Sequence, residues 1–131
     1  MLSKTGRHAV RALMALAELP EGRFLGANVI AETIGAPPNY LGKLLQRFAE
    51  EGLVVSQKGL GGGFRLGRSP AEITLFQILD PVEDLSPWSG CVLGKPTCSD
   101  DSPCRLHGRW KVIKEQYIDL LVSTSLADLT E

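Results

Sequence analysis

The sequence is poor in cysteine, in aromatic residues and in long apolar runs. It has three cysteines among 131 residues, and 6% of its residues are aromatic. A secreted disulfide scaffold normally has a larger and even set of cysteines. No run approaches the roughly 18 apolar residues of a membrane span, and the opening MLSKTGRHAV lacks the apolar stretch of a signal peptide. We therefore expect a cytoplasmic protein without membrane contact, whose clustered cysteines serve metal or redox chemistry.

The residue patterns of an enzyme are also missing. The sequence contains no recognisable nucleophile–base pair and no carboxylate dyad. Its glycine-rich run GLGGG at 59–63 has no strand-to-helix step and no following GK[ST], so it does not match a nucleotide-binding loop. We therefore expect a binding protein and not an enzyme.

A net charge of −1 conceals two halves of opposite sign. Residues 1–70 contain nine basic and five acidic residues, whereas residues 71–131 contain five basic and ten acidic residues. Excess positive charge in one half favours contact with a polyanion such as nucleic acid. An excess of four positive charges also suits an ordinary solvated surface. We divide the chain into a DNA-binding domain at 1–70 and a cysteine-loop, cluster-binding and dimerisation region at 71–131.

Helical periodicity predicts three helices in the basic half, at about 4–19, 27–34 and 38–51. The last two, joined by a tight turn, match a helix-turn-helix. Polar side chains on the outer face of the third helix suit base edges and phosphates, although an ordinary solvated helix face would have the same pattern. These candidate DNA contacts are Asn39, Tyr40, Lys43, Gln46 and Arg47.

A basic, glycine-rich hairpin is predicted to follow the third helix. Strand-like segments at 53–56 and 64–66 flank the run KGLGGG. Glycine allows positive φ and close approach of the backbone to another surface, and a basic tip suits a minor groove or a line of phosphates. Helix-turn-helix and hairpin together indicate a winged helix. The candidate contacts in the hairpin are Lys58, Gly61, Gly62 and Arg65.

The acidic half contains a possible metal site. Cys91, Cys98, Cys104 and His107 form the pattern C-x6-C-x5-C-x2-H, the first three within or at the exit of a loop at 86–103. Three thiolates and one imidazole suit either a four-coordinate zinc ion or an iron–sulfur cluster. The spacing does not distinguish the two.

A long helix is predicted at about 104–123, and its apolar residues are spaced as in a coiled-coil seam. In so small a chain, such a seam favours burial against a second copy, although packing on its own domain is the alternative. The expected fold is thus mainly α with a small β-hairpin, a winged helix-turn-helix followed by a long C-terminal dimerisation helix. The seam consists of Leu106, Trp110, Ile113, Tyr117 and Leu120.

The chain resembles the Rrf-type family of bacterial winged-helix transcriptional regulators, which includes the IscR and NsrR branches. The matching stretches are LSKTGRHAVRALMALA at 2–17, YLGKLLQRFAEEGLV at 40–54, KGLGGGFRLGR at 58–68 and CRLH at 104–107. This resemblance implies a homodimer that binds double-stranded promoter DNA as a repressor or activator. It also implies an iron–sulfur cluster that senses redox state, nitric oxide or iron and cluster status.

The resemblance further implies which residues hold the cluster. Cys91, Cys98 and Cys104 match the thiolate ligands, and members with a [2Fe–2S] cluster have a histidine at the position of His107. Members with a [4Fe–4S] cluster instead use an acidic residue from the first helix of the partner subunit, where this chain has Arg7. A [2Fe–2S] cluster is therefore favoured over [4Fe–4S]. A structural zinc ion, or no metal, with no sensing role is the alternative.

Overall fold

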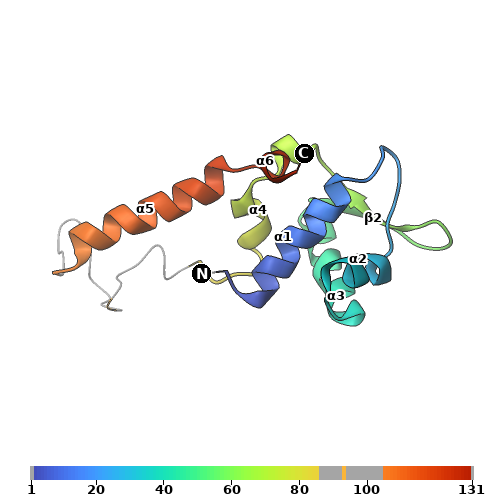
Figure 1. The fold of residues 1–131 in the computed structure, drawn as a ribbon, viewed down its shortest axis with the longest axis horizontal. Helices are drawn as coiled ribbons and strands as arrows, with labels where there is room; N and C mark the ends of the chain where they lie inside the picture. Colours follow the sequence, from blue (N-terminus) through green and yellow to red (C-terminus); the bar gives the residue numbers. More distant parts are fainter. Residues whose placement is uncertain (1, 86–92, 94–104, 131) are drawn as a thin grey trace.

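The computed structural model describes residues 2–85, 93 and 105–130, and it confirms a mainly helical fold with one small sheet. Figure 1 shows the helical body, with the hairpin at one end and α5 extending from the other. The elements in chain order are α1 (Lys4–Ala17), α2 (Ala27–Ile34), α3 (Pro38–Glu50), β1 (Val54–Gln57), β2 (Gly63–Leu66), the short 3-10 helix η1 (Pro70–Glu72), α4 (Leu75–Leu79), α5 (His107–Ser123) and α6 (Leu126–Leu129).

Local capping explains where the first two helices begin and end. The Ser3 hydroxyl accepts a hydrogen bond from the Gly6 amide at 2.9 Å, which fixes the start of α1. This helix ends two residues earlier than predicted, because the Glu18 and Leu19 amides donate to carbonyls three residues back. The predicted bounds of α2 are confirmed, and Gly35 ends that helix in the left-handed conformation with φ +73°.

The wing is an antiparallel hairpin whose register pairs Val54 with Leu66 and Gln57 with Gly63. It is fastened to the body by Leu25, whose backbone exchanges two hydrogen bonds with Phe64 at 2.8 and 2.9 Å. Gly63 lies at this junction with φ +131°, and a Cβ there would collide with the Leu25 carbonyl. The segment between α1 and α2 thus holds the base of the wing.

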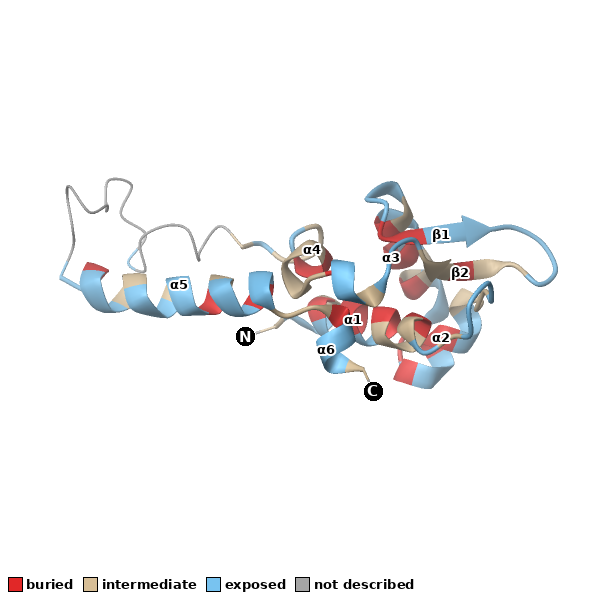
Figure 2. Ribbon diagram, turned by 90° about the horizontal axis from the view of Figure 1, so that it is seen from above, coloured by how far each residue is buried: buried red, intermediate tan, exposed pale blue. Residues whose placement is uncertain are grey.

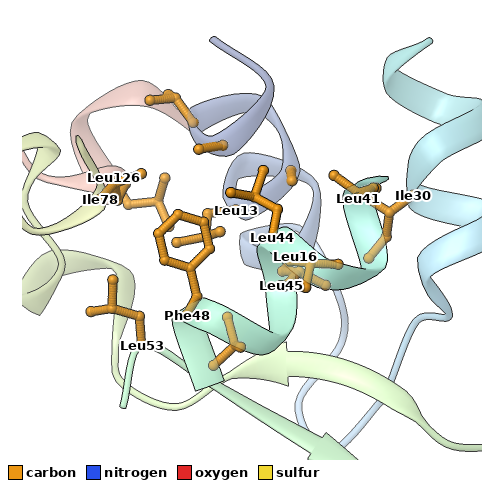
Figure 3. Packing of buried hydrophobic residues seen from close by; sticks show 14 of the residues in the cluster. Leu13, Leu16, Ile30, Leu41, Leu44, Leu45, Phe48, Leu53, Ile78 and Leu126 are labelled. Atoms are coloured by element: carbon orange, nitrogen blue, oxygen red, sulfur yellow. The ribbon is translucent and has the colours of Figure 1, made fainter. Parts of the chain in front are cut away.

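One hydrophobic core joins the three-helix body to the C-terminal segments. Figure 3 shows the Phe48 ring from α3 among side chains of α1, α4 and α6, including Leu13, Ile78 and Leu126. All four of these side chains are fully buried. The core therefore continues across residue 70, the boundary at which the sequence analysis divided the chain.

Helix α5 is mostly outside this core. It begins at His107, not at the predicted Cys104, and the residues immediately before 105 lie outside the described part of the chain. Figure 2 shows exposed residues along most of its length, on the side of the body opposite the wing. Its C-terminal end packs near α4, and a bridge between Thr74 and Ser125 returns the chain to the body. None of the described helices is both long and apolar enough to cross a membrane.

The predicted seam of α5 is divided between two environments. Tyr117 is buried in its own chain together with Leu121, one turn further on. Ile113 and Leu120 are 53% and 52% exposed. Packing on its own domain therefore accounts for only part of the predicted seam, and burial of the exposed part against a second copy stays a prediction.

Candidate nucleic-acid interface and metal centre

A groove lined by α2, α3 and β2 brings together most of the predicted DNA contacts of the third helix. Asn39, Lys43, Gln46 and Arg47 are exposed and line one cavity of about 640 Å³. They lie on one side of α3 because Lys43 follows Asn39 by four residues, and Gln46 and Arg47 follow Lys43 by three and four. Opposite them, Leu41, Leu44, Leu45 and Phe48 are buried and fix the rotation of the helix. We call this cavity the recognition groove.

Tyr40 lies apart from the recognition groove. Its ring packs edge to face on His8 of α1, with the centroids 5.6 Å apart. Its hydroxyl is buried and has no hydrogen-bond partner in the structure. The expectation that Tyr40 faces outward with the other four residues is therefore corrected: its ring packs on His8 of α1, and its contact with DNA stays a prediction.

The recognition groove also contains residues that the sequence analysis missed. Asn28 of α2, Glu50 at the end of α3 and Phe64 of β2 line it. Asn28 is exposed and its amide has both a donor and acceptors for base edges. The polar first turn of α2 was the available signal, but only the packing of α2 on α3 shows that Asn28 faces the same groove.

The glycines of the wing have different roles. Gly59 and Gly61 have φ +91° and +76°, and their amide backbone is exposed at the tip beside Lys58. A Cβ at Gly62 would collide with the Gln57 carbonyl, so Gly62 is required for closure of the hairpin. Gly61 and Lys58 are accordingly accessible to a partner, whereas Gly62 is half-buried and structural.

Arg65 is held against the body and is not free at the wing tip. Its guanidinium carbon lies 4.9 Å from the centre of the Phe24 ring, and its Nε atom is buried with no hydrogen-bond partner in the structure. It lines a second cavity of about 500 Å³ with Arg23 and Arg68. Glu21 also lines it, so the three guanidinium groups outnumber one carboxylate and give the side of the wing a net positive charge that suits phosphates.

The predicted metal ligands are described only in part. His107 is the first residue of α5 and is 8% exposed. Cys91, Cys98 and Cys104 lie outside the described residues, and within the described ranges no group of three or more His, Cys, Asp or Glu side chains is placed to hold a metal ion. The donor chemistry of the four residues nevertheless fits an iron–sulfur cluster, since thiolates and imidazole are its protein ligands.

A hydrogen-bonded contact joins the start of α1 to the segment that precedes Cys91 in sequence. Glu83 accepts hydrogen bonds from the Ser3 amide at 2.8 Å and from the Ser3 hydroxyl at 2.7 Å. Gly6 makes room for the carboxylate, because a Cβ at that position would overlap it. Burial, and then the charge of Glu83, raise the pKa of Tyr117 above its ordinary value. Glu83 thus contacts the DNA-binding body and influences α5.

The fold and the recognition groove define a winged-helix DNA-binding protein. Over residues 2–131 the chain matches the Rrf2 family, described as iron-dependent transcriptional regulators, and it belongs to that family. The family and the relatives are transcriptional regulators and not enzymes. Regulators of this family bind DNA and are typically dimeric.

Named relatives and solved structures agree with this assignment. The HTH-type transcriptional regulator IscR of Xenorhabdus nematophila is 31% identical over 130 residues, which cover 99% of this chain and 79% of the relative. IscR of Aliivibrio salmonicida is 33% identical over 98% of this chain and 76% of the relative. The structure of CymR, the global cysteine regulator of B. subtilis, superposes with a TM-score of 0.79 at 28% identity, covering 98% and 95% of the two chains. T. potens IscR gives 0.76 at 27% identity, covering 98% and 85%. The chain is therefore an IscR- and CymR-like transcriptional regulator.

Proposed function

We propose that this regulator carries an iron–sulfur cluster and that the state of the cluster sets its affinity for promoter DNA. The proposal rests on the possible metal ligands. Three cysteines and one histidine lie close together in the sequence of a chain that also has the helix-turn-helix of a DNA-binding protein. Cys91, Cys98, Cys104 and His107 would hold the cluster, with [2Fe–2S] favoured over [4Fe–4S]. A bound cluster would supply a redox- and nitric-oxide-sensitive group.

Promoter recognition is assigned to the recognition groove and the wing tip. Asn39 and Gln46 carry amides that pair with adenine, and Lys43 and Arg47 carry charges that suit guanine or phosphate. Lys58, Gly61 and Gly62 would bring the wing to the adjacent minor groove or phosphates, while Arg65 presents charge at its side. The operator is expected to be a pseudo-palindrome, because a dimer with twofold symmetry presents the same recognition helix, α3, from each subunit. Its half-sites are expected to lie about 34 Å apart, one helical turn of DNA.

Homodimerisation is assigned to α5. Its exposed apolar side chains are too numerous for a helix that remains in water, and their burial against a second copy would remove them from solvent. Tyr117 would remain in the core of its own chain. The exposed apolar residues on α5 and immediately before it are Leu106, Val112, Ile113, Leu120 and Val122.

Communication between the two sites is assigned to the contact at the start of α1. Glu83 lies eight residues before Cys91 in sequence and holds Ser3, while His8 of the same helix contacts Tyr40 at the start of α3. A displacement of Glu83 would therefore move α1 against the recognition helix. Such a packed, hydrogen-bonded path is a physical means of coupling two sites.

The cytoplasm is the expected location of such a regulator.

The direct test is an absorption spectrum of protein purified without oxygen, with iron, sulfide and zinc assayed in the same sample. Absorbance in the near-ultraviolet and visible regions with equal amounts of iron and sulfide would support the proposal, and their number per chain would identify the cluster. Colourless protein with one zinc ion per chain would instead favour a structural metal. Protein that remains metal-free after reconstitution would favour a regulator without a cluster.

A further inference from the structure

A small cavity lies between the first turns of α1 and α3, away from the recognition groove. It measures about 260 Å³ and is lined by Lys4, Thr5, His8, Pro37 and Tyr40. Its four polar side chains can each donate a hydrogen bond. No carboxylate is among these lining residues. Its described lining is therefore rich in donors and positive charge and contains no carboxylate acceptor.

Two of these polar groups have no hydrogen-bond partner among the residues that the structure describes. The His8 side chain is 8% exposed, and neither its Nδ1 atom nor the Tyr40 hydroxyl has a hydrogen-bond partner in the structure. The edge-to-face contact between the two rings keeps both groups at the same cavity. Buried polar groups without partners are rare in native proteins, and an unpaired pair beside a cavity indicates a ligand or ordered solvent.

The surroundings favour a negatively charged occupant over water alone. Helix α3 begins at Pro38 without a side-chain cap, so the positive end of its dipole lies beside the cavity, whereas the start of α1 already holds the Glu83 carboxylate. Burial lowers the pKa of His8 below its ordinary value, and the charges of Lys4, Arg11 and Arg7 lower the same pKa further. Three cationic side chains of α1 therefore lie near the imidazole.

We propose that this cavity, the α1–α3 pocket, binds a small oxyanion, namely a phosphate or carboxylate group. Thr5, His8 and Tyr40 would donate hydrogen bonds to its oxygens, and the Lys4 ammonium would balance its charge. A bound oxyanion would fix the start of the recognition helix against α1. The oxyanion comes either from a free solute or from the DNA backbone, and only the second source rests on the proposed function.

Phosphate titration followed by NMR tests the pocket without DNA. Sodium phosphate is added to the full chain at fixed pH, with ionic strength held constant by sodium chloride, and the side-chain resonances of His8 and Tyr40 are recorded. Wild type is expected to give a saturable shift at His8. Tyr40→Phe keeps the ring contact but removes one donor, and it should weaken phosphate binding about tenfold. Tyr117→Phe removes the same hydroxyl from α5 and should leave the affinity for phosphate unchanged.

Two results would overturn the proposal. One is a wild-type response that rises linearly with phosphate and never saturates, which would indicate general salt effects. The other is an equal affinity for phosphate in wild type and Tyr40→Phe, because the hydroxyl would then have no part in binding. Thr5→Val provides a second donor deletion if Tyr40→Phe fails to fold, and it should also weaken binding.

Addition of duplex DNA to the phosphate-loaded protein identifies the source. If DNA displaces phosphate and produces its own shift at His8, the occupant is a backbone phosphate. If the phosphate shift persists in the complex, the pocket takes a free anion while the recognition groove takes DNA. Binding of a labelled duplex is measured separately by fluorescence anisotropy. Absence of duplex binding would contradict the proposed function and would leave the phosphate titration as a complete test of the pocket.

Discussion

The winged-helix body and α5 differ in how far their apolar side chains are buried. Each helix of the body has a face that is buried within the same chain, and Phe48, Leu45 and Leu41 are fully inaccessible to solvent. Along the 17 residues of α5, only His107, Tyr117 and Leu121 are buried. The body is therefore stabilised by its own core, whereas α5 carries apolar surface that only another surface can cover.

The largest expected effect is on self-association. In the double variant Ile113→Glu and Leu120→Glu, two carboxylates replace exposed apolar side chains of α5, and burial of each unpaired charge would cost more than about 3 kcal/mol. We expect this variant to sediment as a monomer at concentrations where wild type is a dimer. Val29→Glu, at a residue 50% exposed on α2, is the matched control and should remain dimeric. A dimeric double variant would place the interface elsewhere.

Two leucines, one in the body and one on α5, should contribute to the free energy of unfolding in different ways. Leu45 is fully buried in the body, and Leu45→Ala should lower the free energy of unfolding by about 2–5 kcal/mol at every protein concentration. Leu120 is 52% exposed, and the effect of Leu120→Ala should appear only at concentrations that favour the dimer. Urea denaturation over a range of concentrations measures both. An equally large and concentration-independent loss for Leu120→Ala would contradict the contrast.

Two glycines of the wing allow the junction with the body to be compared with the wing tip. Gly63→Ala combines φ +131° with a collision against the Leu25 carbonyl, and it should destabilise the fold by about 1–3 kcal/mol. Gly61→Ala faces open space and carries only the strain of φ +76°, at a cost of about 1 kcal/mol. Thermal denaturation measures both variants. Equal losses would show that the junction with Leu25 does not hold the wing.

The smallest effect is expected at the wing tip. Lys58→Ala removes one exposed charge and should weaken binding to all duplexes alike, lowering the slope of log affinity against log salt by about one unit. Lys114→Ala on α5 removes the same charge far from the recognition groove and should leave that slope unchanged. Fluorescence anisotropy at several salt concentrations provides the measurement. A changed sequence preference in Lys58→Ala would show that Lys58 reads bases.

Most of the body could be predicted from the sequence, because local signals there agree with the tertiary structure. Gly35 ends α2 as its conformational freedom predicts, and the apolar spacing of α3 identifies its buried face. Tyr40 was misplaced because its ring packs on His8, which lies 32 residues earlier in the sequence, and no local signal in the sequence contains that contact. The same holds for Asn28, which reaches the recognition groove only because α2 packs on α3.

The seam of α5 shows a second limit of sequence reasoning. The spacing of apolar residues places Tyr117 and Ile113 on one face of the helix. It does not predict how much of that face is covered by the core of the same chain. In the structure Tyr117 and Leu121 are buried, whereas Val112, Ile113, Leu120 and Val122 are exposed on both sides of Tyr117 in the sequence. Periodicity thus predicts which residues form an apolar face, but it does not predict whether that face is buried in the same chain or against another one.

The central claim is that the cysteine segment controls DNA affinity, and Cys98→Ala tests it most directly. Affinity for promoter DNA is compared between anaerobically purified wild type and this variant at one salt concentration, after sedimentation has shown that both are dimers. A coupling of about 1–3 kcal/mol predicts a difference of about 5- to 150-fold. Equal affinities in wild type that contains the cluster and in the variant that lacks it would contradict the account.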